Sequence, residues 1–476
     1  MINAKVNKHL LSKEFIQEVK AMAKTSVVKD MTIGNETRLL INFMLPMLVG
    51  NIFQQLYNIA DSIIVGQHVG SDSLGAIGCT APITFLFFSI CQGIGMGAGI
   101  MVAQYFGAGN KEQVKKTLTN SFYIVALSGI LLSVLGVIFT RPVLELLGTP
   151  TNQLEDAVKY MHITCAGTIA VAIYNYASQV MRALGDAKTP LYFIFVATIL
   201  NVLLDLYFII DLEMGVEGAA YATIIAQGVS AIGSLITAAI INPYFKLEKA
   251  HFELDIKLTK LCLKVGLPLG MQGFAIAISC VILQAFVNSF DENVVTAFTV
   301  TSRVEQFVQQ PYSSLAMAVS TFTGQNMGAG QEQRVRRALH RSVAIVGVIS
   351  IVMLVVCFGA GELIIRCFVD DLAVIKIGTM GLKIISIMFF PLGIIYVTRG
   401  LLNGANDSTY AFINGGIEVT GRILFSVLMV FVAGAGQWSV WLATGLTWLL
   451  AGTVGVLRYK QNIWVTKSIT EERLKA

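Results

Sequence analysis

The sequence predicts an all-α polytopic membrane protein, with twelve transmembrane helices arranged as two parallel-repeat bundles of six helices each. An excess of apolar residues, a series of long apolar segments and an internal duplication support this prediction. Hydrophobic residues make up 55% of the 476 residues, charged residues only 13%, and the mean hydropathy is +0.70. Soluble chains carry about 25% charged residues. The composition therefore makes the lipid bilayer the solvent for most of this chain.

Apolar segments of about 20 residues are long enough to cross the hydrocarbon core of a bilayer. Ten such segments are separated by polar connections: 39–60, 74–109, 117–140, 160–181, 189–210, 218–245, 265–290, 306–331, 342–361 and 377–398. The run 423–457 is too long for one crossing and is divided at Gly434 and Gly436. This division predicts an eleventh helix near 408–433 and a twelfth near 437–457.

Positive charge is concentrated on alternate connections, and this bias sets the expected orientation. Lys and Arg cluster in both tails and in the connections after the second, sixth and eighth spans. Both termini are therefore expected in the cytoplasm, with the protein in a bacterial-type plasma (inner) membrane. Since the net charge of +5 belongs to these connections, no nucleic-acid partner is expected. The chain is predicted to begin with an amphipathic cytoplasmic tail (1–37) and to end with a second cytoplasmic tail (461–476). Between them lie an amino-terminal lobe (38–245) and a carboxyl-terminal lobe (246–460).

An internal repeat relates the two lobes. The segment 104–109, which reads Gln-Tyr-Phe-Gly-Ala-Gly, recurs at 325–330 as Gln-Asn-Met-Gly-Ala-Gly, a shift of 221 residues. Asp186 returns as Asp407 at the same shift. Because six spans is an even number, both copies enter the membrane from the same side and the repeat is parallel. The expected architecture is a transporter in which two rigid bundles rock about a central cavity.

Ionisable residues inside the predicted spans are candidate functional residues, because their desolvation is costly unless they are paired or hydrated. Asp61 follows Arg38 by 23 residues, which is about 34 Å of helix. Asp205 follows Lys188 by 17 residues, which is about 25 Å. Both acids are therefore expected in the outer half of the membrane, and Asn201 shares a helix face with Asp205 at i, i+4 spacing.

Two further residues are expected at a similar depth. Thr223 and Tyr160 stand near the beginning of helices that enter from the outer side, so the five residues could converge within the amino-terminal lobe. Such a cluster could carry coupling chemistry, or it could be a buried hydrogen-bond network that only fixes helix packing. Both interpretations stay open at the level of the sequence.

The carboxyl-terminal lobe carries four charged residues within its spans. Glu418 and Arg422 in the eleventh helix have the i, i+4 spacing of a structural ion pair, and a role in substrate binding is equally compatible with their position. Arg303 and Glu305 in the eighth helix are two residues apart and cannot face each other, so we expect their partners on other helices.

Motifs of enzymes are absent from this sequence. There is no G-x-x-x-x-G-K-[ST], H-E-x-x-H or G-x-S-x-G, so neither ATP use nor an enzymatic reaction is expected, and no cofactor is predicted. Gly93, Gly95 and Gly97 imitate a dinucleotide fingerprint, but they lie within a membrane span, where close helix packing is the better interpretation. Seven cysteines fall almost entirely in apolar runs without metal-ligand spacing.

Several motifs resemble those of multidrug and toxin extrusion (MATE) transporters. They are Pro46 in the first helix, the segment 57–66 (Tyr-Asn-Ile-Ala-Asp-Ser-Ile-Ile-Val-Gly), the Gly-Ala-Gly loop after the second helix, 182–186 (Arg-Ala-Leu-Gly-Asp) with Thr189-Pro190, and 215–223 (Gly-Val-Glu-Gly-Ala-Ala-Tyr-Ala-Thr). The resemblance extends over about residues 38–460 and rests on the order of the motifs, the twelve spans and the parallel repeat.

The resemblance implies a cation or proton site in the amino-terminal lobe. Members of the DinF-type branch use an aspartate of helix one, an Asn-x-x-x-Asp pair of helix five and a threonine of helix six. Asp61, Asn201, Asp205 and Thr223 match that pattern, and Tyr160 matches it less closely. The NorM-type branch carries a glutamate in helix seven and an aspartate in helix ten. Both are absent here, which places the chain closer to the DinF-type branch.

The implied function is a secondary active antiporter that exports lipophilic, often cationic, drugs or toxins in exchange for protons or sodium, acting as a monomer. Two carboxylates held close in a low dielectric cannot both ionise cheaply, so a proton is favoured, although Asp61, Asn201, Asp205 and Thr223 could also supply oxygens to sodium. A bend at Pro46 is expected to respond to ionisation of the aspartate. The alternative is a lipid-linked saccharide flippase, which would need a more basic central cavity, whereas most Lys and Arg belong to the loops.

Overall fold

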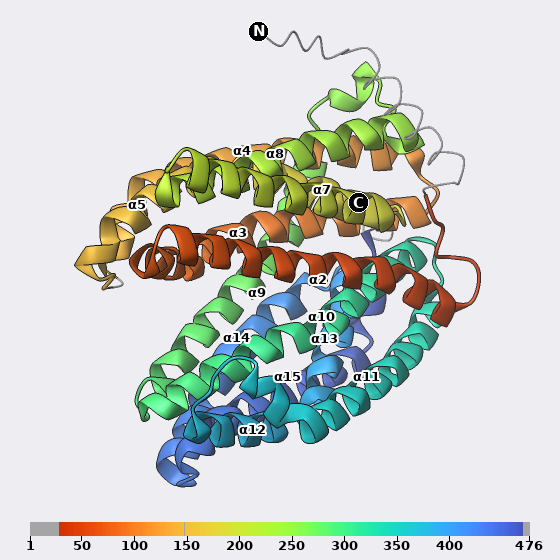
Figure 1. Ribbon diagram of the computed structural model, residues 1–476. Coiled ribbons are helices and arrows are strands. Elements are labelled where there is room, and N and C mark those ends of the chain that lie inside the picture. Colours follow the sequence, from red (N-terminus) through yellow and green to blue (C-terminus); the bar gives the residue numbers. More distant parts are fainter. Residues whose placement is uncertain (1–27, 147, 470–476) are drawn as a thin grey trace, which may run out of the picture.

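The computed structural model describes residues 28–146 and 148–469 and is helical throughout its regular structure (Figure 1). The helices of the first half are α2 (Glu36–His68), α3 (Ser71–Gly107), α4 (Lys111–Leu146), α5 (Thr151–Ala166), α6 (Thr168–Ala183), α7 (Lys188–Asp205) and α8 (Gly215–Ile241). Those of the second half are α9 (Ile256–Val287), α10 (Glu292–Gly328), α11 (Glu332–Arg366), α12 (Leu372–Ser386), α13 (Phe389–Gly404), α14 (Ser408–Val427) and α15 (Ser439–Lys460). The amphipathic helix predicted within residues 1–37 lies mostly outside the described residues.

Short non-α segments complete the two halves at equivalent places. A π-helical segment, Leu206–Asp211, continues α7, and another, Leu428–Val432, continues α14. Four short 3₁₀ helices occupy connections: Pro243–Phe245, Lys249–Phe252, Gly436–Trp438 and Ile463–Lys467. Isolated π-helical turns are often found at functional sites, and the first of these begins directly after Asp205.

The predicted fourth and tenth spans are each made of two helices. α5 and α6 meet at a 48° bend around Gly167, and α12 and α13 meet at a 50° bend around Ile387 and Met388. The two bends lie at equivalent positions of the repeat. The sequence predicted spans over 160–181 and 377–398 but not their bends, because hydropathy runs through both breaks without interruption.

The described residues contain nine helices long and apolar enough to cross a membrane, and eleven such spans when each bent pair is taken as one. The remaining long helix is α10, whose 37 residues include many amides and hydroxyls. Gln309, Gln310, Ser313 and Thr321 of this helix line an internal cavity. α10 therefore completes the twelve predicted spans, and its polarity has a structural reason.

The two halves pack against each other through α3 and α9, which cross at glycines. A Cβ atom at Gly97 would lie 2.7 Å from Cα of Gly266, and one at Gly93 would overlap the backbone of Gly270. Only residues without a side chain permit this approach. The prediction that Gly93 and Gly97 serve close helix packing is confirmed.

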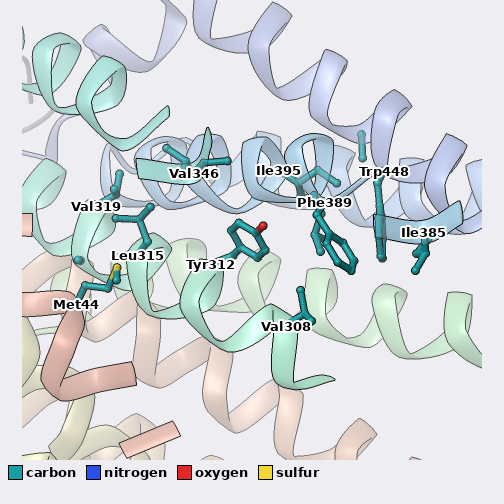
Figure 2. Packing of buried hydrophobic residues seen from close by; sticks show 14 of the residues in the cluster. Met44, Val308, Tyr312, Leu315, Val319, Val346, Ile385, Phe389, Ile395 and Trp448 are labelled. Atoms are coloured by element: carbon teal, nitrogen blue, oxygen red, sulfur yellow. The ribbon is translucent and has the colours of Figure 1, made fainter. Parts of the chain in front are cut away.

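The largest buried apolar cluster surrounds α10 in the second half (Figure 2). Tyr312 and Leu315 of α10 lie among Phe389 of α13 and Trp448 of α15, and Met44 of α2 extends the cluster into the first half. α10 thus has one face in this core and another at the cavity. In Figure 1, the halves converge near the beginning of α2 and diverge toward α5 and α12.

Candidate functional site: an acidic pair beside a central cavity

Two carboxylates meet between α2 and α7. Asp61 stands 25 residues after the start of α2, which is about 38 Å along the helix. Asp205 is the last residue of α7 and is fully buried. The two carboxyl groups lie close enough to interact directly with each other. Span counting from the sequence predicted a common depth for both acids, and the structure places them side by side.

Neutral polar groups surround this acidic pair. The Thr223 hydroxyl of α8 lies 3.2 Å from the Tyr57 hydroxyl of α2 and accepts a hydrogen bond of 3.4 Å from the Asn201 amide. Tyr160 of α5 is close enough to interact electrostatically with both aspartates. The structure thus brings together the five residues that the sequence singled out.

Tyr57 is an additional member of this cluster that was not predicted from the sequence. It lies four residues before Asp61, so the two share a face of α2. That i, i+4 relationship is the signal that could have identified it.

Several oxygens of this cluster lack a hydrogen-bond donor among the described residues. They are Asp61 Oδ1, both carboxyl oxygens of Asp205 and Asn201 Oδ1. Burying polar atoms without partners is costly, and two adjacent ionised carboxylates repel each other. A shared proton would relieve this repulsion, and a sodium ion could bind the same oxygens. No group of three or more His, Cys, Asp or Glu side chains suited to a metal ion occurs in the described chain.

A cavity of about 790 Å³ lies between the two halves and is lined by residues of both. Asp61, Tyr57, Tyr160 and Thr223 border it, whereas Asp205 lies behind them. Amides, hydroxyls and aromatic rings make up much of the remaining lining. A volume of this size suits a small organic molecule.

Two arginines, Arg182 of α6 and Arg399 of α13, also line the cavity. Neither was selected from the sequence as a site residue, because each stands directly after a predicted apolar segment. α6 continues to Ala183 and α13 to Gly404, so both guanidinium groups lie within the helical part of the fold.

Glu418 and Arg422 of the second half interact with other residues and not with each other. Glu418 forms an ion pair with Arg399 of α13, not with Arg422, so the expected i, i+4 pair is not formed. Arg422 instead donates to the Thr444 hydroxyl at 3.5 Å.

Glu305 of α10 accepts a hydrogen bond of 2.7 Å from Gln309 and interacts electrostatically with Arg422 of α14. Arg303 is exposed. None of the four residues predicted as substrate or ion-pair positions, namely Arg303, Glu305, Glu418 and Arg422, is among the residues that line the cavity.

At one end of the cavity the repeated segments 104–109 and 325–330 join the two halves, and we refer to this end as the closed end. Gln104 of α3 donates to the Gly404 carbonyl at 2.9 Å and accepts from the Ile469 amide at 2.8 Å. Gln325 of α10 donates to the Ala183 carbonyl at 2.9 Å and accepts from the Met31 amide at 2.8 Å.

A bundle of membrane helices in two repeated halves, with a cavity between them and a buried acidic pair at its wall, defines a two-lobed membrane transporter. The MatE family model matches residues 46–207 and again residues 268–428, once in each half. The chain belongs to the MatE family of multidrug and toxin extrusion transporters, which are not enzymes.

The chain is 29% identical to the Probable multidrug resistance protein YpnP of Bacillus subtilis over 455 residues, covering 93% of this chain and 99% of the relative. It is 27% identical to an FAD transporter of Shewanella oneidensis over 373 residues, covering 77% and 82%. A solved structure of a multidrug resistance MATE transporter in an outward-facing conformation has a TM-score of 0.85 at 22% identity, with 91% and 97% covered. The similarity to this solved structure supports the two-lobed fold.

Proposed function

We propose that this protein is a secondary active antiporter that exports small lipophilic molecules in exchange for a cation. The observation that carries the proposal is the position of Asp61, which borders the central cavity and reaches Asp205 behind it. A group at this place can exchange a cation with the cavity while remaining linked to a buried acid. Relatives named as multidrug resistance proteins support the same function.

The proposed transport cycle alternates access to the cavity between the two sides of the membrane. The charge bias of the connections supports an orientation in which the closed end faces the cytoplasm, in a bacterial plasma membrane. Binding of a cation at the acidic pair would favour one arrangement of α2, and binding of cargo would favour the other. A ligand shifts a conformational equilibrium only through its differential affinity for the two states. Cation and cargo would therefore bind in alternation, each favouring the arrangement that the other disfavours.

A proton is the favoured coupling ion. Two carboxylates in contact retain a shared proton readily, and movement of one charge across 100 mV contributes about 2.3 kcal/mol. The sodium alternative rests on the same site, with oxygens from Asp61, Asn201, Asp205 and Thr223. The monomer predicted from the sequence is sufficient for this mechanism, because one chain supplies the whole cavity.

The flippase alternative gains one specific observation from the two arginines at the cavity wall, since a lipid pyrophosphate needs cationic partners. The multidrug function is still better supported, because Arg399 is already paired with Glu418. In proteoliposomes, release of a lipid-linked saccharide to the opposite leaflet, without export of dyes, would favour the flippase.

The coupling ion can be tested with purified protein in proteoliposomes loaded with a panel of fluorescent dyes of both charges. We expect dye export to follow an imposed pH gradient in sodium-free buffer and to cease when the gradient is collapsed. Export that follows a sodium gradient at constant pH would overturn the proton assignment. Absence of export under either gradient would overturn the antiporter itself.

A further inference from the structure

Arg182 is placed at the closed end of the central cavity, in the last turn of α6. The carbonyl of the next residue, Ala183, accepts the hydrogen bond of 2.9 Å from Gln325 that links the two halves there. The side chain of Arg182 lines the cavity. Its position is therefore fixed at the floor of the space in which cargo would bind.

The guanidinium of Arg182 has no carboxylate partner within the part of the chain that the structure describes, and its buried Nε has no hydrogen-bond acceptor there. The other charged groups of the cavity wall differ in this respect. Arg399 is paired with Glu418, and Asp61 faces Asp205. The cavity floor thus carries one positive charge that is not balanced by a described neighbour.

Other polar side chains that can bind an anionic group line the floor of the cavity beside Arg182. Gln179 and Ser178 lie one turn before it on α6, and both line the cavity. Asn403 of α13, which stands 221 residues after Arg182 and is therefore its equivalent in the repeat, lines the cavity from the opposite half.

A half-buried guanidinium without a counter-charge is unfavourable, and a planar guanidinium matches the two oxygens of a carboxylate, sulfonate or phosphate group. Toward the other end of the cavity the lining includes Phe85 and Phe88 of α3, which suit an aromatic or apolar body. The cavity therefore combines an anion-binding floor with aromatic side chains farther along its wall, where Asp61 also lies.

We propose that cargo binds with a negatively charged group held by Arg182 at the closed end of the cavity. The preferred cargo is an anionic or zwitterionic amphiphile, in place of the lipophilic cation that the family resemblance led us to expect. Its export as a physiological process rests on the proposed function, whereas its binding to Arg182 does not.

The test is equilibrium binding to the purified full-length protein in lipid nanodiscs, without any ion gradient. Fluorescein and rhodamine 123 share a xanthene ring system but carry opposite charges, so they are matched probes. We expect the wild type to bind fluorescein more tightly than rhodamine 123. Arg182→Gln should weaken fluorescein binding about tenfold or more, the usual loss for a charged hydrogen bond, and leave rhodamine 123 binding no weaker.

Two further variants separate recognition from folding and from overall charge. Arg182→Lys retains the positive charge and should keep part of the fluorescein affinity. Arg366→Gln removes an exposed arginine that pairs with Glu362 outside the cavity, and should leave binding unchanged. Thermal unfolding verifies that Arg182→Gln is folded, which we expect because no described acid loses its partner.

The proposal would be overturned by a wild type that does not bind fluorescein, that prefers rhodamine 123, or that binds fluorescein no better than Arg182→Gln does. These results are distinct from a failure of antiport. A protein that binds fluorescein through Arg182 but exports nothing under a pH or sodium gradient would retain the anion site and lose the proposed function.

Discussion

Gln104 and Gln325 occupy equivalent positions of the two repeats, and each donates a hydrogen bond to a backbone carbonyl of the opposite half, at 2.9 Å in both cases. The acceptors, Gly404 and Ala183, are themselves related by the repeat shift of 221 residues. Each glutamine also accepts from a backbone amide outside the helical bundle, of Ile469 or of Met31. The closed end is thus held by a reciprocal pair of buried amides.

The first prediction concerns this reciprocal pair. Gln104→Leu or Gln325→Leu leaves a buried carbonyl and a buried amide unpaired, at about 1–3 kcal/mol for each group, so the closed end should open more often. A cysteine at the cavity-lining position Ser320, in a background without native cysteines, should then react faster with a membrane-impermeant thiol reagent added on the side of the chain termini.

Gln284→Leu is the matched control for both variants, because it removes an exposed hydrogen bond to Asn288 within one helix. It should leave the labelling rate unchanged. Labelling of position 320 that is as slow in Gln104→Leu and Gln325→Leu as in the control would show that the two amides do not hold the closed end.

The second prediction concerns the glycines beside these glutamines. A Cβ atom at Gly107 would overlap the Gln325 carbonyl, and one at Gly328 would overlap the Gln104 carbonyl. Either Gly→Ala substitution should therefore separate the halves at the closed end and lower the thermal unfolding temperature. Gly359→Ala is the control, since a Cβ atom there meets nothing within 4 Å. Equal unfolding temperatures for Gly107→Ala and Gly359→Ala would contradict the proposed close contact.

The third prediction concerns the buried ion pair of the second half. The side chains of Arg399 and Glu418 are only 17% and 7% exposed, so Glu418→Gln leaves a guanidinium unpaired inside the protein. Loss of one partner of a buried pair costs about 3–5 kcal/mol. Glu362→Gln, which breaks the exposed pair with Arg366, should cost about 1 kcal/mol or less. Thermal unfolding measures the loss of stability in both variants. A similar loss in Glu418→Gln and Glu362→Gln would mean that the Arg399–Glu418 pair is effectively exposed to solvent.

The fourth prediction concerns Pro46. The helix α2 continues through this proline without interruption, from Glu36 to His68. Proline removes the backbone donor to the fourth preceding residue, so the helix is easier to bend at this turn, fifteen residues before Asp61. Pro46→Ala restores that donor and should slow transport while preserving the unfolding temperature. A normal turnover rate in this variant would restrict Pro46 to a packing role.

The acidic cluster was predictable from the sequence because helix geometry converts residue counts into depth. Asp205 interrupts an otherwise apolar segment, Asp61 directly follows one, and the i, i+4 spacing adds Asn201 to the face of Asp205. The contacts depend only on which helices are neighbours, which the family resemblance supplied. Assignment to the DinF-type branch stays a prediction.

The parts that were not predicted depend on contacts between distant helices. Arg182 and Arg399 stand at the edges of apolar segments, where hydropathy cannot separate a loop from the last turn of a helix. The partner of Glu418 lies on α13, so i, i+4 spacing alone selected the wrong arginine. At the bend, Gly167 packs against Ile224 of α8 so closely that a Cβ atom would not fit, and such a contact leaves no signal in composition.

The central claim is that Asp61 couples the cation to export, and uphill transport tests it most directly. Proteoliposomes with a pH gradient and equal dye concentrations on both sides should accumulate dye with the wild type. With Asp61→Asn, which preserves shape but cannot carry the exchangeable proton, we expect no accumulation, while dye still binds and the protein remains folded. Accumulation by Asp61→Asn to the wild-type level, at equal protein density, would contradict the account.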